Sequence, residues 1–162
     1  MVSDAAARAR TLIARSQNMV LATSDRGGVP WVTPLFYVAD AGHSLLWTSA
    51  PDARHSENIR ENAAVAIVIY ADSPGARADA VYLEGEAHEL SADADLAAAI
   101  ATIARKPQPT RWRITAASDV SGTGPWRIYR ARITAVSVRL LTTSGGRAVA
   151  RRETVKLGQA WP

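Results

Sequence analysis

Residues 48–62 read TSAPDARHSENIREN, and residues 64–70 read AVAIVIY. The first run predicts the end of a strand, a tight turn and a helix over about 51–62, with Ser49 as its cap and Pro51 in its first turn. The second run has no polar alternation before its end, which predicts a strand buried on both faces. The two runs together predict a strand–helix–strand unit.

The start of this predicted helix has the chemistry of an anion site. Free backbone N–H groups, the hydroxyls of Thr48 and Ser49 and the cation of Arg54 meet there, with His55 beside them. Such a helix start can hold an anion such as a phosphate. A capped surface helix without a ligand has the same local sequence, so this stretch alone leaves both interpretations open.

The rest of the chain alternates short strands with turns and contains two further helices. We expect strands at 18–23, 31–38, 44–48, 81–88, 126–141 and 147–157, helices at 3–16 and from Ser91 to Lys106, and loops at 72–79 and 107–125. Structure that is rich in hairpins and poor in helices indicates an antiparallel barrel. The predicted fold is mainly β (α+β), a single domain over residues 1–162 with six or seven strands and two or three flanking helices.

Two residues inside predicted strands carry specific expectations. Pro34 cannot donate a ladder hydrogen bond, so it predicts an edge strand, a bulge or a place where something other than a strand lies alongside. Gly85 predicts a bend or the close approach of another backbone.

Composition excludes several classes of protein. The 162 residues contain no cysteine, which rules out disulfides, Cys-ligated zinc, iron–sulfur clusters and thiol catalysis. No apolar run approaches the ~18 residues of a membrane span, and the first 16 residues lack the pattern of a secretion signal. We therefore expect a cytoplasmic protein that does not enter a membrane.

Charge is divided unevenly along the chain. Residues 1–103 carry seven arginines and 13 acidic residues, whereas residues 104–162 carry 12 basic and two acidic residues. The basic third predicts either an anionic ligand or an oligomer in which it meets the acidic part of another copy. Nucleic-acid binding is a third possibility, because Trp112, Trp126 and Tyr129 alternate with arginines. We do not expect nucleic-acid binding, since these residues follow strand alternation and the acidic part would repel nucleic acid.

Five landmarks in order resemble the pyridoxamine 5′-phosphate oxidase-like family, over roughly residues 5–140. They are VLAT at 20–23 with GVPWVTPLF at 28–36, LWTS at 46–49, RHSENIRENAAVA at 54–66, LEGEA at 83–87, and WRIYR at 126–130. The resemblance implies the FMN-binding split-barrel fold. It also implies a homodimer with two flavin sites at the subunit interface.

The resemblance also implies a set of cofactor-binding residues. The phosphate is expected at Thr48, Ser49, Arg54 and His55, with Trp47 beside them on the third strand. The isoalloxazine ring is expected along the second strand, at Val32, Thr33, Pro34 and Leu35. A strand beside a flat ligand need not present every N–H to a neighbour, which fits Pro34. For Trp31 and Trp47, packing in the core or an interface is a more common role than stacking on a ring.

The chain departs from true pyridoxamine phosphate oxidases at several positions. His55 stands where the family usually has a lysine, residues 31–36 contain no charge, and Ala80 replaces an expected glutamine. The substrate-binding Arg/His signature near the C-terminus has no clear match, although Arg147, Arg151 and Arg152 lie in that region. Oxidation of vitamin B6 is therefore not expected.

The function that the resemblance implies is an FMN-dependent oxidoreductase that acts on a small molecule, with hydride chemistry carried by the cofactor. One alternative is a reductase that uses the deazaflavin coenzyme F420, whose anionic tail suits the basic third. Another is a non-catalytic flavin- or haem-binding protein, with His88 or His55 as the haem ligand.

The sequence shows no catalytic cluster. His43, His55 and His88 lack metal-ligand spacing, so no metal site is predicted. Glu84 and Glu86 fit a solvated strand face better than an acid–base pair. In the 107–125 loop, the run RWR at 111–113 either closes over the substrate side or lies on a plain surface loop.

Overall fold

The computed structural model describes residues 4–71, 80–107 and 113–162. The predicted loop at 72–79, and Arg111 and Trp112, lie outside the described residues. Within them the chain forms eight strands: β1 Asn18–Ser24, β2 Pro30–Phe36, β3 Val38–Asp40, β4 Ser44–Ser49, β5 Ala64–Tyr70, β6 Ala80–Glu89, β7 Arg127–Ser144 and β8 Arg147–Val155. The helices are α1 Asp4–Arg15, α2 Arg54–Glu61, α3 Asp93–Ala104, a 3₁₀ turn at Ala117–Val120 and α4 Leu157–Ala160.

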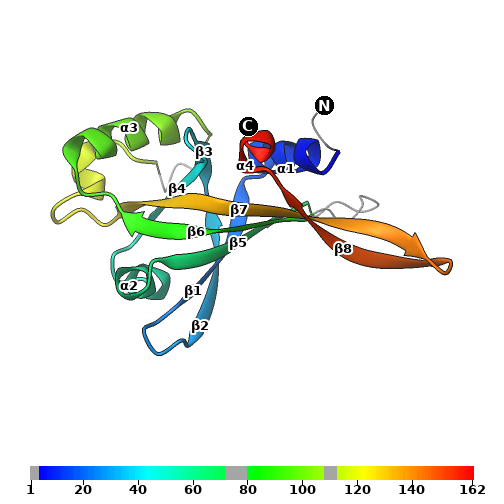
Figure 1. Cartoon of the computed structure of the whole chain (residues 1–162). Helices are drawn as coiled ribbons and strands as arrows, with labels where there is room; N and C mark the ends of the chain where they lie inside the picture. The colour runs from blue at the N-terminus through cyan, green and yellow to red at the C-terminus, as the bar shows by residue number, and fades with distance from the viewer. Residues whose placement is uncertain (1–3, 72–79, 108–112) are drawn as a thin grey trace.

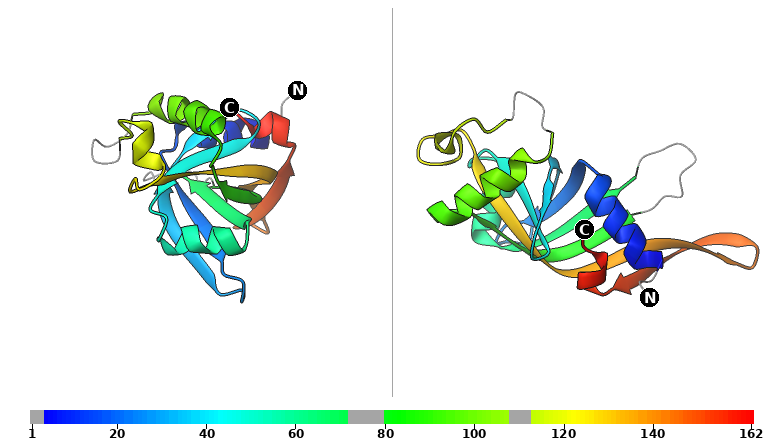
Figure 2. Two further views of the ribbon diagram at one scale, coloured as in Figure 1. Left: turned by 90° about the vertical axis from the view of Figure 1, so that its left-hand side faces the viewer. Right: turned by 90° about the horizontal axis from the view of Figure 1, so that it is seen from above.

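All strands belong to one antiparallel sheet in the order β2-β1-β5-β6-β7-β4-β3, with β8 paired to β7. The two end strands, β2 and β3, follow one another in the chain and are separated only by Tyr37. The sheet must therefore curl until its two edges approach each other, as Figure 1 and Figure 2 show. This geometry is the predicted split β-barrel, and it confirms the expected fold class.

The main core lies on the concave side of the sheet, which we call the inner face. Helix α1 packs there through Ala6, Ala9 and Ile13, against strand residues such as Leu21 and Leu83. The side chain of Tyr37 is fully buried, and its hydroxyl donates to the carbonyl of Ile13 at 2.8 Å. A second, smaller core lies beneath α3 and includes Leu96, Ile103, Leu46, Val120 and Ile128.

Most of the predicted elements are present, with shifts at their ends. The predicted strand 31–38 is two strands, because the chain turns at the buried Tyr37 to reach the other edge of the sheet. Helix α3 begins after Ala92 rather than at Ser91, and α2 begins after Ala53. The turn at 144–146 ends β7 as expected, whereas the short α4 follows β8 without a sequence signal.

The prediction that the strand at 64–70 is buried on both faces was wrong. Its residues alternate, with Val65, Ile67 and Ile69 buried and Ala66 and Tyr70 exposed. The opposite side of the sheet, which we call the outer face, is uncovered along β1, β2 and β5 in the single chain. A run of apolar residues thus predicts a strand that is buried on both faces only if the same chain supplies a covering layer on each side of the sheet.

Gly85 lies where β6 shifts register against β7. A Cβ atom at this position would collide with the backbone carbonyl of Arg132. The predicted close approach of another backbone is therefore confirmed. None of the helices in the described ranges has the length and apolar character that crossing a bilayer requires.

Candidate cofactor site

The candidate site begins where β4 ends and α2 starts. The chain leaves Ser49 through a turn in which Ala53 N–H donates to Ala50 at 3.2 Å, and the first helical bond runs from Glu57 N–H to Ala53 at 3.0 Å. The backbone N–H groups of residues 54–56 therefore have no partner within the helix. They supply the positive end of a helix dipole beside β4.

Ser49 does not cap this helix, contrary to the prediction. Its hydroxyl lies 2.7 Å from Nε2 of His55, and both side chains are buried. Burial lowers the pKa of His55, so its ring is neutral near pH 7 and does not act as a second cation. The pair instead presents a hydroxyl and an imidazole, each able to donate or accept one hydrogen bond.

Arg54 supplies the charge at this end of α2. Its side chain is exposed, and its guanidinium lies 4.5 Å from the centre of the Trp31 ring on β2. Trp31 is 39% exposed and so is not a core residue, in contrast to Trp47. The stack holds the guanidinium near the helix start and leaves its N–H groups free for an anion.

Side-chain hydrogen bonds fix α2 against β1. Asn58 donates to the hydroxyl of Thr23 at 3.0 Å, and Asn62 donates to the hydroxyl of Ser24 at 2.9 Å. In the first turn, the hydroxyl of Ser56 donates to the carbonyl of Ala50 at 2.8 Å. The helix start is therefore a rigid feature of the sheet.

Strand β2 is an edge strand, which is one of the three alternatives that Pro34 predicted. Pro30 and Pro34 have no N–H, and together with Val32 they occupy one set of alternate positions on β2. The ladder hydrogen bonds to β1 therefore use the other set of alternate positions. Bonds at the two ends of the ladder, Asp25 N–H to Val29 and Tyr37 N–H to Gln17, have the same alternation. The backbone N–H of Val32 consequently points to the open edge.

The nine predicted cofactor residues occupy two neighbouring places. Ser49, Arg54 and His55 lie at the start of α2, with Thr48 next to them in the chain at the end of β4, and Val32, Thr33, Pro34 and Leu35 belong to the edge strand beside α2. Trp47 differs, because its side chain is 1% exposed and stacks on Tyr129 in the core. Only its backbone could take part in binding.

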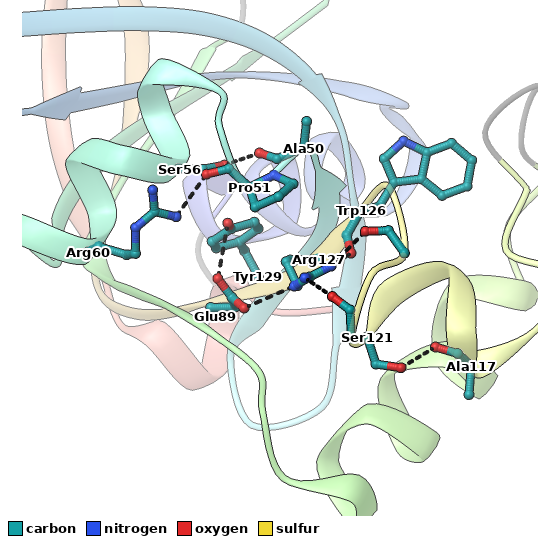
Figure 3. Close-up of polar contacts among 12 residues, drawn as sticks. Ala50, Pro51, Ser56, Arg60, Glu89, Ala117, Ser121, Trp126, Arg127 and Tyr129 are labelled. Carbon is teal, nitrogen blue, oxygen red and sulfur yellow. Dashed lines mark hydrogen bonds and ion pairs between the residues drawn. The ribbon is translucent and has the colours of Figure 1, made fainter.

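Sequence reasoning missed a polar network behind this site, which Figure 3 shows. The hydroxyl of Tyr129 donates to Glu89 at 3.3 Å, and Glu89 pairs with Arg127 at 3.4 Å. Arg127 also donates to the carbonyls of Gly122, Gly124 and Trp126. The WRIYR motif at 126–130 was the available signal, but nothing local showed that Glu89 would meet it.

This network connects the first turn of α2 with the loop at 121–126. Burial raises the pKa of the Tyr129 phenol, and a hydrogen bond with Ser56 of α2 partly opposes that rise. Tyr129 is therefore a neutral hydroxyl that bridges two elements. Its side chain is fully buried.

The other candidate residues do not join the site. His43 has a positive φ of 61° and packs edge-on against Trp161, whereas His88 is exposed on β6. Glu84 and Glu86 are both exposed on the outer face, as expected for a solvated strand face. Among residues 4–71, 80–107 and 113–162, no group of three His, Asp or Glu side chains could hold a metal ion.

Comparison with known proteins places the chain in a family. The family model described as pyridoxamine 5′-phosphate oxidase matches residues 5–137. The chain belongs to this family. No curated protein matches it in sequence.

Solved structures share its fold at low sequence identity. A haem-binding protein from Mycobacterium smegmatis superposes with a TM-score of 0.70 and 23% identity, over 99% of this chain and 61% of that protein. An FAD-binding protein from Mesorhizobium loti gives 0.61 and 23%, over 79% and 88%. An F420 reductase gives 0.58 and 22%, over 78% and 93%.

The donor set at the start of α2 fits the phosphate of a flavin. It combines free backbone N–H groups, two hydroxyls and a guanidinium. The edge of β2 fits a planar ring with polar atoms at its rim, because the N–H of Val32 is directed to an open edge flanked by two prolines.

Proposed function

We propose that the protein is an FMN-dependent oxidoreductase that works as a homodimer on a small molecule. One observation carries this proposal: the open edge of β2 and the start of α2 lie side by side, joined by the stack of Arg54 on Trp31. A flavin mononucleotide needs hydrogen-bond donors for its phosphate and a surface for its planar ring, and these two places would supply them.

In this proposal, the chain's own residues bind and orient the cofactor. Arg54, the hydroxyls of Thr48 and Ser49 and the N–H groups of residues 54–56 hold the phosphate. Neutral His55 acts through Ser49 by fixing the direction of that hydroxyl. The backbone of residues 32–35 holds the ring, and a bound flavin supplies the hydride chemistry.

The homodimer has its support in the exposed outer face. Val32 on β2 is 61% exposed, and Tyr70 is 53% exposed on β5, a strand whose other face is core. Burial of such a face by a second copy is favourable by about 25 cal/mol for each Å² of apolar surface.

The test is a titration of the purified protein with FMN, read by absorbance and flavin fluorescence. We expect Arg54→Ala to weaken FMN binding about 10- to 100-fold, since a hydrogen bond to a charged group contributes about 1.5–3 kcal/mol. Arg105→Ala, an exposed change at the far end of α3, is the matched control and should bind like the wild type. Equal affinities of both variants would contradict the phosphate assignment.

Two alternative ligands are separated by the same measurement. A deazaflavin signal with F420 and none with FMN would favour an F420-dependent reductase, as in the structural neighbour of that name. A Soret band after addition of haem would favour a haem-binding protein, as in the mycobacterial neighbour. His88 would then be the candidate ligand, because it is exposed whereas His55 is buried.

A further inference from the structure

Tyr37 stands where the edge strand β2 ends and the chain crosses to β3. Three of its groups are held by other segments. Its N–H donates to the carbonyl of Gln17 at 3.2 Å, and its hydroxyl donates to the carbonyl of Ile13 at 2.8 Å. Its own carbonyl accepts a hydrogen bond from the ammonium of Lys106 at 2.9 Å. Contacts at Tyr37 therefore fix the place where β2 ends.

Lys106 reaches this point from the end of α3. It is the second residue after that helix, and its ammonium donates another hydrogen bond, at 2.7 Å, to the carbonyl of Ser16. Ser16 directly follows α1, where the last carbonyls have no partner within the helix and a nearby cation is favourable. One ammonium thus joins α1, the end of α3 and the end of β2.

The same ammonium lies against two aromatic rings. Its nitrogen is 4.5 Å from the centre of the Tyr37 ring and 5.3 Å from the centre of the Phe36 ring, which is within the range of a cation–π attraction. Among the described residues, no carboxylate forms an ion pair with Lys106. Burial lowers the pKa of this half-buried ammonium, and the two carbonyls and two rings are the groups that favour its charge.

Strand β2 has a cation on an aromatic ring at each end. Arg54 lies on Trp31 near its first residue, and Lys106 lies on Phe36, its last residue. The two ends are about 16 Å apart, at a rise of about 3.3 Å for each residue. The backbone of residues 32–35, which is proposed to hold the flavin ring, lies between them. Because β2 pairs with β1 alone, no second strand holds that backbone in place.

We propose that Lys106 is a positioning residue for the flavin ring. Its ammonium fixes the carbonyl of Tyr37 and so sets the position of the ring-binding backbone that directly precedes it. The inference rests on the proposed function, because it requires the ring to lie along β2. Lys106 acts through Tyr37 and does not itself touch the cofactor.

Titration with two flavins separates the two ends of β2, because riboflavin has the ring of FMN and lacks its phosphate. Lys106→Met should raise the dissociation constants of both flavins by the same factor of about ten, the loss of roughly one or two hydrogen bonds to the ring. Arg54→Ala should raise the constant for FMN and leave the constant for riboflavin near the wild-type value. In the double variant the two factors for FMN should multiply, since distant sites are independent.

The spectrum of the bound flavin gives a readout that belongs to the ring. In Lys106→Met the visible absorption band and the fluorescence of the bound flavin should differ from those of the wild type, because the ring meets a displaced backbone. In Arg54→Ala the spectrum of bound riboflavin should be that of the wild type.

Two control variants separate positioning from charge and from stability. Lys156→Met removes the only other lysine of the chain, an exposed residue directly before α4, and should bind both flavins like the wild type. Leu96→Ala weakens the packing of α3 near its first residue. It should lower the melting temperature and leave both constants unchanged at a temperature where every variant is folded. Lys106→Gln keeps an N–H donor and is the milder variant, which replaces Lys106→Met if that protein does not fold.

Amide hydrogen exchange tests the contact at Tyr37 without any flavin. Loss of the Lys106 hydrogen bond should speed the exchange of the Tyr37 N–H, which donates to Gln17, by about tenfold. Lys156→Met should leave that exchange unchanged.

The proposal is overturned if the Lys106 variant binds both flavins like the wild type, if it weakens binding of FMN alone, or if Leu96→Ala gives the same losses and the same change of spectrum. A wild type that binds neither flavin overturns the proposed function and this assignment together. Flavin binding that does not depend on Lys106 would remove the positioning role and leave the flavin site standing.

Discussion

At the scale of single residues, the candidate site combines a buried neutral pair with an exposed cation. Ser49 and His55 lie inside the fold, whereas the guanidinium of Arg54 stays at the surface on Trp31. Positive charge near the proposed phosphate therefore comes from the guanidinium of Arg54. His55 orients the hydroxyl of Ser49 and adds no charge near pH 7.

The burial of His55 predicts that stability falls in mild acid. Its pKa is lowered in the fold, so the unfolded chain takes up a proton more readily, with a pKa of about 6.5. The contribution of neutral His55 to the free energy of unfolding is therefore complete above about pH 6.5, and it is lost as the pH falls through the lower pKa of the folded state. Thermal unfolding between about pH 5 and 8 should show a weaker pH dependence for His55→Gln. His88→Gln, a substitution at an exposed position, is the control. If the wild type and both variants showed the same dependence of stability on pH, the burial of His55 would not be its cause.

The register shift at Gly85 predicts a large cost for a small side chain. Gly85→Ala places a Cβ against the carbonyl of Arg132 and should destabilise the protein by about 1–3 kcal/mol, a typical cost of overpacking. Gly158→Ala in α4 is the matched control, because no atom lies within 4 Å of the added Cβ. Denaturant unfolding should find Gly158→Ala at least as stable as the wild type. Equal stabilities of the two variants would contradict the close contact.

At the scale of elements, Arg127 connects a loop to the sheet and to α2. It holds three carbonyls of the 121–126 loop and pairs with Glu89, which accepts from Tyr129. The guanidinium can make these contacts together because its donors are arranged as a planar fork. The loop, Glu89 at the end of β6 and Tyr129 on β7 are therefore parts of one hydrogen-bonded unit.

Replacing Arg127 with lysine should release this loop. Arg127→Lys keeps the charge but loses the fork, and each hydrogen bond to a charged group contributes about 1.5–3 kcal/mol. Amide hydrogen exchange in residues 121–126 should become about tenfold faster or more. Arg132→Lys, an exposed change on the same strand, is the control. Unchanged exchange in Arg127→Lys would show that the loop is held by other contacts.

At the scale of the whole molecule, the sheet has one face that helices cover and one face that is partly exposed. The inner face is closed by α1 and α4, and its residues are almost fully buried. The outer face keeps Val32 and Tyr70 exposed, together with the carboxylate of Glu86. The uneven charge of the sequence fits this division, because the basic β7–β8 hairpin belongs to the last third and Glu86 to the first two-thirds. Association of two copies would complete the outer layer.

Local pattern by itself determined the turns, most of the strands and the three longer helices, and it gave an edge position as one of three alternatives for the strand that contains Pro34. These features depend on residues close in the chain, such as the alternation around Leu83 and the missing N–H of Pro34. The resemblance of ordered motifs to the pyridoxamine 5′-phosphate oxidase family indicated the split barrel, and the family model and the structure confirm it.

Only the tertiary structure decided which groups meet across the fold. It turned Ser49 from a helix cap into the partner of His55 and joined Glu89 to Tyr129 and Arg127. It also showed that β5 is buried on one face alone. The physical reason is common to all three: hydrogen-bond partners and covering layers come from segments distant in the chain, and the curl of the sheet brings those segments together.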